Sequence, residues 1–197
     1  MVSRKRTAPH QSRIAAARGR TGDRGASTLD LIREDVRTHR GSRVSAGVHA
    51  LAVHRLGTAL HGSSRPAARL ARPLYRMARA LVVSVYHVEL PATARIGRRL
   101  FMPHPHGIVV VPGATLGDDC MIRHNVTVGA GSDTRGGTPT IGDRVQFGPG
   151  SIVMGDVHVG DDVLIGPGAV VIHDVPAGSR VLAPAATARP AKSRRAA

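Results

Sequence analysis

The chain has 197 residues and a formal net charge of +15, and with two Phe, two Tyr and no Trp it lacks the large aromatic side chains of an ordinary globular core. Its 23 Gly and 13 Pro favour a repeated fold of small aliphatic residues and turns. The single cysteine excludes an intrachain disulfide framework, and no apolar run approaches the roughly 18–20 residues of a membrane span. A basic start without a following apolar stretch indicates no signal peptide, so we expect a cytoplasmic protein.

The positive charge lies outside the central part of the chain. Residues 1–26 carry a net charge of +6, residues 27–87 carry +7 and residues 185–197 carry +4, whereas residues 88–184 carry −2, from seven basic and nine acidic side chains. Arg- and Ala-rich ends without interleaved aromatic residues are typical of solvated arms rather than of nucleic-acid-binding surfaces. We therefore expect neither a nucleic acid nor a membrane as a partner.

Four segments follow from these patterns. Residues 1–26 are expected to be a disordered basic tail, residues 27–87 a helical section, residues 88–184 a repeat domain and residues 185–197 a basic C-terminal tail. Because a stack of repeats has an exposed apolar end, the helical section is expected to cover that end.

Apolar spacing predicts three helices in the helical section. They are expected near residues 29–41, 48–62 and 66–87. Pro73 is expected to kink or interrupt the third helix because it lacks a backbone N–H. The apolar residues of the third helix that are expected to point inward are Leu70, Leu74, Met77, Leu81 and Val85.

From Ile96 to about residue 176 the apolar period becomes six. Six residues make one short strand and a turn, and three such strands close a triangular coil of about 18 residues. Glycine often follows the aliphatic residue and is expected to supply the positive φ of a tight corner. The spacing predicts a mainly β protein, a single-stranded left-handed parallel β-helix after the helical section, in exception to the right-handed crossover rule. The inward residues are expected to be Leu116, Ile122, Val128, Ile141, Phe147, Val153, Val159, Ile165 and Val171.

Two segments break the period of six. Residues 101–107 place two histidines between the first coil and the second, and residues 130–138 form a polar, glycine-rich insertion. Regular scaffolds carry function on such excursions. Cys120 keeps to a small-residue coil position, so we expect it in the core.

Histidines are the candidates for acid–base chemistry, because imidazole has a pKa suited to removing a proton from a hydroxyl. His104 and His106 flank a proline in the first break, where a side chain can be held towards a cleft, and His124 can face the same cleft from the next coil. Others are expected to be idle, because they lie in a tail, on helices or at outward coil positions: His10, His39, His49, His54, His61, His158 and His173.

The first break and its flanks resemble the serine O-acetyltransferase family. The matching residues are Val88-Glu89-Leu90-Pro91-Ala92-Thr93-Ala94-Arg95-Ile96-Gly97 and Pro103-His104-Pro105-His106-Gly107-Ile108-Val109-Val110. Residues 47–57 and the ending Asp174-Val175-Pro176-Ala177-Gly178 are also similar, so the resemblance covers about residues 29–184. It implies an O-acetyltransferase of cysteine biosynthesis that uses acetyl-CoA as cosubstrate.

The resemblance also implies roles for particular residues. His104 corresponds to the general base and Glu89 to the carboxylate that orients it, with direct transfer of the acetyl group and no acyl-Cys120 intermediate. Candidate acceptor-site residues are His106, His124 and Thr138. Positions that would contact CoA, mainly through their backbone, are Ala130, Gly131, Gly148, Pro149 and Gly166, and Arg180 or Arg189 would meet its phosphates.

Departures from the family pattern leave the acceptor open. The family has aspartate before its catalytic histidine, where this chain has Pro103. The family's Asp-Arg-His-Pro loop ending is replaced by Gly136-Gly137-Thr138-Pro139, and its acidic residue in the helical part has no match in residues 39–43. L-Serine is the leading acceptor, and a hydroxyl of a sugar, polysaccharide or natural product is the alternative.

Two other functions fit the same scaffold. One is a metal enzyme like γ-type carbonic anhydrase, but the spacing of His104, His106 and His124 does not match that family, so we expect no metal. The other is a non-catalytic homologue. The resemblance further implies a homotrimer with its active site between neighbouring subunits, and it leaves open a dimer of trimers formed through the helices.

Overall fold

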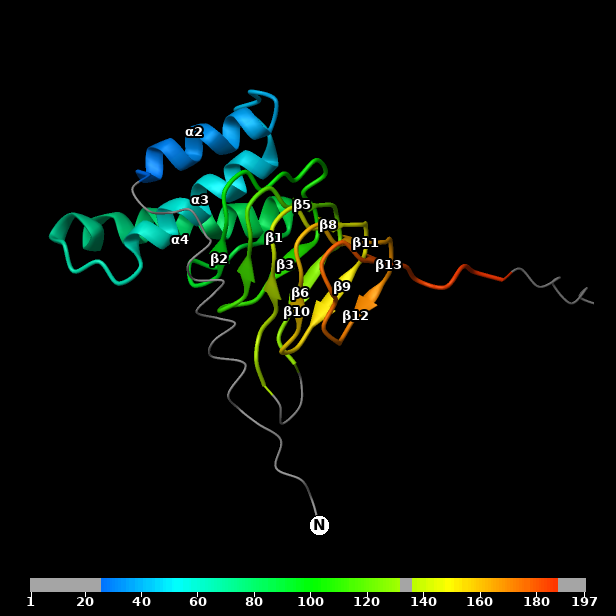
Figure 1. Ribbon diagram of the computed structural model, residues 1–197. Helices are drawn as coiled ribbons and strands as arrows, with labels where there is room; N and C mark the ends of the chain where they lie inside the picture. Colours follow the sequence, from blue (N-terminus) through cyan, green and yellow to red (C-terminus); the bar gives the residue numbers. More distant parts are fainter. Residues whose placement is uncertain (1–25, 132–135, 188–197) are drawn as a thin grey trace, which may run out of the picture.

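The computed structural model describes residues 26–131 and 136–187, so the tails predicted at residues 1–25 and 188–197 lie outside the described residues. Three helices precede a stack of short parallel strands (Figure 1). The helices lie at the end of the stack where the first strand begins, and the chain then advances coil by coil away from them. No helix in this described part of the chain is long and apolar enough to cross a membrane.

The three predicted helices are present. Helix α2 spans Thr28–Thr38, α3 spans Ala46–Leu60 and α4 spans Pro66–Tyr86. The Ser27 side chain accepts a hydrogen bond from the backbone N–H of Asp30, which caps the start of α2. Pro73 lies inside α4 without ending it, so the predicted interruption does not occur.

The prediction that the apolar stripe of α4 points inward is wrong. Its side chains are 54–83% exposed, whereas Ala68 and Val82 of the same helix are buried. A period of 3.6 residues identifies which side chains share a face of a helix, but it does not identify what that face packs against. The exposed stripe consists of Leu70, Leu74, Met77, Leu81 and Val85.

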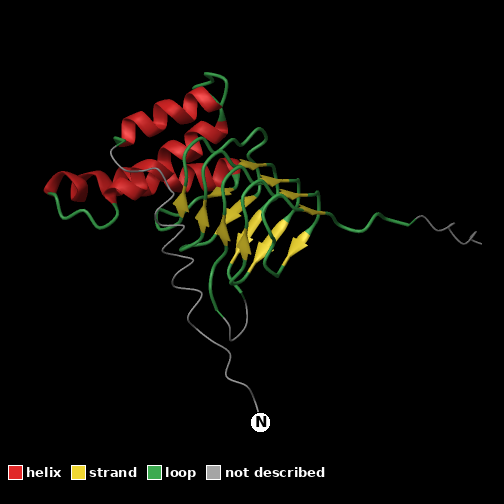
Figure 2. Cartoon of the chain, viewed as in Figure 1, coloured by secondary structure: helices red, strands yellow, loops and turns green. Residues whose placement is uncertain are grey.

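The repeat domain is a parallel β-helix of about five turns, as the period of six predicts. Its short strands stack along the β-helix (Figure 2). They form three parallel sheets with the orders β1-β3-β6-β9-β12, β2-β4-β7-β10 and β5-β8-β11-β13. The strands are β1 Val88–Glu89, β2 Arg95–Ile96, β3 Ile108–Val110, β4 Thr115–Leu116, β5 Met121–Ile122, β6 Thr127–Gly129, β7 Thr140–Ile141, β8 Gln146–Phe147, β9 Ile152–Met154, β10 His158–Val159, β11 Leu164–Ile165, β12 Val170–Val171 and β13 Arg180–Val181.

The register between neighbouring coils shows where residues are inserted. Thr140 pairs with His158, 18 residues later, which is the regular step of three hexapeptides. Arg95 pairs with Thr115 after 20 residues, and Thr115 pairs with Thr140 after 25 residues. The extra two and seven residues correspond to the two predicted breaks, at residues 101–107 and 130–138.

The predicted inward residues form the core of the coils. Leu116, Ile122, Phe147 and Val153 are fully buried and belong to one apolar cluster. Cys120 is also buried, as predicted, and burial raises the pKa of its thiol to about 12. A thiol with such a pKa stays protonated near neutral pH, which suits a packing role.

The glycines that follow the aliphatic residues do not carry the positive φ that was expected of them. Instead they permit close stacking: a Cβ on Gly117 would lie 2.5 Å from the carbonyl oxygen of Gly142 in the next coil. The left-handed conformation falls two residues later, at Asp119 and Arg144 with φ of 57° and 56°. The glycine is therefore needed for contact between coils rather than for turn geometry.

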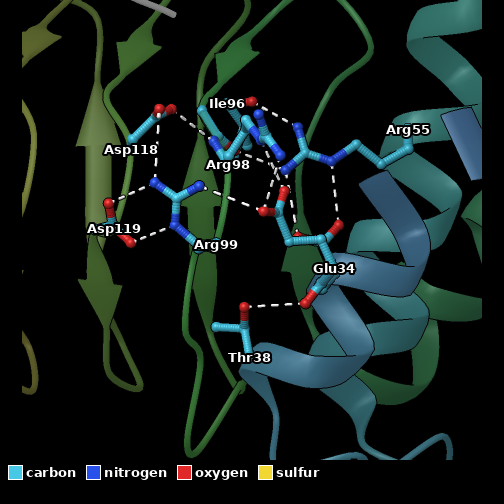
Figure 3. Close-up of polar contacts among 10 residues, drawn as sticks. Glu34, Thr38, Arg55, Ile96, Arg98, Arg99, Asp118 and Asp119 are labelled. Carbon is cyan, nitrogen blue, oxygen red and sulfur yellow. Dashed lines mark hydrogen bonds and ion pairs between the residues drawn. The ribbon is translucent and has the colours of Figure 1, made fainter. Parts of the chain in front are cut away.

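Side chains from the helices satisfy the open backbone edge of the first coil. Arg55 of α3 donates to the carbonyl oxygens of Ile96 and Gly97 at 2.5 and 2.6 Å (Figure 3). His39, at the end of α2, accepts a hydrogen bond from the backbone N–H of Met102 at 3.1 Å. Buried backbone groups without partners are costly, so these contacts join the helices to the β-helix in a defined position.

Charged residues fasten the same junction on its outer side. Arg98 donates to the Glu34 carboxylate at 2.8 and 3.0 Å, and Arg99 contacts both Glu34 and Asp119 (Figure 3). The hydrogen bonds from Arg98 hold the pKa of Glu34 below its ordinary value. Helix α2 is thereby bound to the first coil, and Arg99 links that coil to the second.

Candidate active site

The histidine segment leaves the coil at a proline. In the next coils the equivalent residues continue the ladder, with the N–H of Arg123 donating to the Phe147 carbonyl and that of Gly148 to the Ile165 carbonyl. Pro103 occupies the same coil position, two residues after the Phe101–Met121 bridge, and has no N–H to donate. The chain therefore departs from the ladder at Pro103 and returns to it at β3.

The excursion holds His104 at the surface beside the next coil. The His104 side chain is exposed, and its ring centroid lies 6.4 Å from that of the half-buried His124, in an edge-on arrangement. His106 is also exposed but lies against His87 at the end of α4, with ring centroids 5.0 Å apart. Two of the three predicted histidines are thus neighbours, while the third faces the helices.

Hydrogen bonds link this excursion to matching corners further along the stack. The carbonyl of His106 accepts from the N–H of Asn125, that of His124 from Gly150, and that of Pro149 from Gly168. We call this edge of the prism the histidine corner, consisting of residues 102–107, 123–126, 148–151 and 166–169. Among the predicted cofactor positions, Gly148, Pro149 and Gly166 lie on it.

Glu89 lies on β1, next to the strand that follows the histidine segment. It is half-buried and pairs with Val109 of β3. Its side chain begins an outward column that continues through the paired residues Val109, Thr127, Ile152 and Val170. The placement puts Glu89 near the end of the sheet that adjoins the histidine corner; contact between its carboxylate and His104 stays a prediction.

The insertion between β6 and β7 lies at a different edge of the prism. The strands that begin at the histidine corner end at this second edge, and β6 is followed there by Ala130 and Gly131. Thr138 lies at the same edge, near Gly113 of the preceding coil. We call residues 111–114, 130–131, 136–139 and 155–157 the loop corner. Arg180 is exposed on β13, in a third position. Within one chain, therefore, Ala130, Gly131 and Thr138 lie on a different corner from His104, and Arg180 lies on neither corner.

Sequence reasoning missed the buried polar groups between the helices and the first coil. His39 and His54 were expected to be idle at polar or boundary positions, yet both are buried, and so are Asp35 and Arg55. The only signal was the spacing of Asp35 and His39 by four residues at the end of one predicted helix, which does not indicate burial. Within residues 26–131 and 136–187, no group of three or more His, Cys, Asp or Glu could hold a metal ion.

Residues 138–173 match the family model of the bacterial transferase hexapeptide, described as six repeats. The chain is 41% identical over 114 residues to a serine acetyltransferase of Helicobacter pylori, a match that covers 57% of this chain and 63% of that protein. It is 34% identical over 87 residues to a putative colanic acid biosynthesis acetyltransferase of Escherichia coli, covering 44% of this chain and 54% of that protein.

A solved structure shares the fold. Soybean serine acetyltransferase complexed with serine superposes with a TM-score of 0.67 at 30% identity, over 78% of this chain and 66% of that chain. The chain spans less than two thirds of the length of these relatives. Serine acetyltransferases have left-handed β-helices, which confirms the predicted handedness. The chain is therefore a hexapeptide-repeat protein of left-handed β-helical fold that is similar to serine acetyltransferases.

Proposed function

We propose that this protein is an O-acetyltransferase that transfers the acetyl group of acetyl-CoA to L-serine, giving O-acetylserine. One observation carries the proposal: the first break in the period of six presents His104 at the surface beside His124, in a chain that is 41% identical over 114 residues to a serine acetyltransferase. A cytoplasmic location and a role in cysteine biosynthesis belong to the same proposal.

The proposed reaction needs a base and a polarised thioester. A serine hydroxyl is a poor nucleophile near neutral pH, so the His104 imidazole would accept its proton as the oxygen attacks the acetyl carbonyl. Glu89 would orient the ring and stabilise the imidazolium, and backbone N–H groups would stabilise the oxyanion. As the tetrahedral intermediate collapses, the C–S bond breaks, and the CoA thiolate takes the proton back from His104.

The separation of the two corners supports a site shared between copies of the chain. Gly148, Pro149 and Gly166 lie with His104 on the histidine corner, whereas Ala130, Gly131 and Thr138 lie on the loop corner. We propose a homotrimer in which the loop corner of one subunit faces the histidine corner of the next. The outward column of Val109, Ile152 and Val170 offers an apolar surface for that contact, because exposed apolar patches often mark interfaces.

A sugar or polysaccharide hydroxyl is the second candidate acceptor. Pro103 and Gly136-Gly137-Thr138 replace the charged residues by which the resembling family grips its amino acid. The similarity to a putative colanic acid biosynthesis acetyltransferase points in the same direction. The chemistry at His104 would be unchanged, since any alcohol requires the same removal of a proton.

A thiol-release assay tests the proposal. Purified full-length protein would be mixed with acetyl-CoA and with L-serine, L-homoserine or a panel of hexoses, and free CoA followed with a thiol reagent. We expect release that depends on L-serine and saturates with its concentration. Release only with a sugar would support the second acceptor, and no release above hydrolysis with any acceptor would contradict transferase activity.

A further inference from the structure

His39 occupies a buried position between the helices and the histidine corner. It follows the last residue of α2 and is 5% exposed. Its ring lies 5.3 Å from that of Phe101, centroid to centroid, and Gly47 of α3 also lies against it. A Cβ on Gly47 would come within 2.7 Å of the His39 Nε2 and 3.1 Å of the Met102 carbonyl oxygen. The His39 ring is therefore packed closely against the backbone of α3.

Two hydrogen bonds define the protonation of this ring. Nδ1 lies 2.8 Å from the carbonyl oxygen of Asp35, which can only accept, so Nδ1 carries a proton. Nε2 lies 3.1 Å from the backbone nitrogen of Met102, whose N–H can only donate, so Nε2 carries a lone pair. The geometry therefore requires the neutral imidazole with its proton on Nδ1.

The Met102 N–H needs this partner because no coil precedes the first one. In the second coil, the equivalent N–H of Ile122 donates to the carbonyl of Phe101 in the coil before. At Met102 the helices take the place of that earlier coil, and His39 supplies the acceptor. Met102 itself is fully buried.

We propose that His39 is a positioning residue for His104. Met102 is the last residue before the excursion whose backbone N–H is held by a hydrogen bond. Pro103 follows it, with a restricted φ and no N–H, and His104 comes directly after Pro103. The hydrogen bond from Met102 to His39 thus sets where the excursion begins and how His104 is aimed. This role rests on the proposed function, in which His104 is the base.

A comparison of three variants tests the role. His39→Leu removes the acceptor, His39→Gln keeps an acceptor in a similar place, and His49→Leu is the control. His49 also lies on the helices and makes two hydrogen bonds, to Tyr86 and to the Arg43 carbonyl, and neither partner belongs to residues 102–107. We expect His39→Leu to lower kcat on the order of 10-fold or more with KM for acetyl-CoA within about twofold, because a small misplacement of a base is costly.

We expect His39→Gln to have most of the wild-type kcat. We expect His49→Leu to have the wild-type kcat even if its melting temperature falls by as much as that of His39→Leu. Full kcat in folded His39→Leu, or an equal loss of kcat in the His49→Leu control, would overturn the positioning role. A wild-type protein that releases no CoA with any hydroxyl acceptor would instead overturn the proposed function on its own.

A measurement on the wild-type protein needs neither activity nor a stable variant. The ¹⁵N shifts of the His39 ring at neutral pH report its tautomer, and we expect the form with the proton on Nδ1. Amide exchange at Met102 should be slow in the wild type and at least about tenfold faster in His39→Leu. A ring protonated on Nε2, or rapid exchange at Met102 in the wild type, would overturn the proposal.

Discussion

The Arg55 guanidinium of α3 lies 3.1 Å from the Asp35 carboxylate of α2, and both side chains are almost fully buried. The same guanidinium donates to the carbonyl oxygens of Ile96 and Gly97 in the first coil. Burial raises the pKa of the Asp35 carboxyl even though Arg55 acts in the opposite direction. This pair therefore joins two helices and the β-helix in one buried network.

Removal of one partner of the pair should destabilise the protein strongly. Arg55→Met leaves a buried carboxylate and two backbone carbonyls without partners, and we expect unfolding to require about 3–5 kcal/mol less free energy. Arg33→Met is the matched control, because its pair with Asp30 is exposed to solvent, which screens the two charges, and should contribute far less to stability. Denaturant titrations measure both. An equal loss of unfolding free energy in Arg55→Met and Arg33→Met would contradict the conclusion that burial makes the Arg55–Asp35 pair the more important of the two.

His54 should make stability depend on pH. Burial, together with the neighbouring Arg55, lowers the pKa of His54 to about 4 from its ordinary 6.5. Below pH 6.5 the unfolded chain gains a proton at this residue that the folded chain does not bind, so stability falls as the pH falls from 6.5 towards 4. The loss at pH 5 amounts to about 2 kcal/mol. Urea titrations at pH 7 and pH 5 measure the fall in the free energy of unfolding between the two pH values. This fall should be smaller by about 2 kcal/mol in His54→Gln than in the wild type, and an equal fall in both proteins would refute the assignment.

His104 should be required for activity and not for folding. Since its side chain is exposed, His104→Ala is expected to change the melting temperature little, while kcat falls on the order of 10²–10⁴-fold. Glu89→Gln should lower kcat less, because it weakens the orientation of the ring and leaves the base in place. His173→Ala, an exposed histidine of the last coil, is the control. Turnover retained by His104→Ala would exclude the proposed mechanism.

A shared site should allow inactive chains to complement one another. We expect Thr138→Trp to block the loop corner, and His104→Ala to remove the base from the histidine corner. Mixed trimers would still contain sites with an intact histidine corner from one chain and an intact loop corner from the other, about a quarter of all sites after random mixing. Co-expression followed by the thiol-release assay measures the recovery. Activity no greater than that of the separate variants would show that both corners belong to one chain's site.

The exposed stripe of α4 is expected to pair with another copy. Burial of five large apolar side chains would stabilise such a contact, and a charge within the stripe would oppose it. Light scattering should therefore show that Leu74→Glu reduces the mass from that of a dimer of trimers to that of one trimer. Arg76→Glu, exposed on the same helix and outside the stripe, should keep the wild-type mass. A common mass for all three proteins would contradict pairing through α4.

Local patterns predicted much of the architecture. The period of six identified the coils because each inward aliphatic residue must stack on its equivalents, and the two breaks in that period match the two-residue and seven-residue insertions in register. The α4 stripe shows the limit of such patterns. Its spacing predicted a helix with an apolar face, but the core packs against the opposite face, at Ala68 and Val82.

By itself the sequence determined the repeat and the helices, since both depend on residue types at short spacing along the chain. Its resemblance to the serine O-acetyltransferase family indicated His104 as the candidate base. Only the tertiary structure decided that His39, Asp35 and Arg55 are buried together against the first coil, and that Thr138 lies on a different corner from His104. The physical reason is that these relationships depend on how the helices close the open edge of the first coil. That closure satisfies backbone groups far apart in sequence, through contacts that no local period encodes.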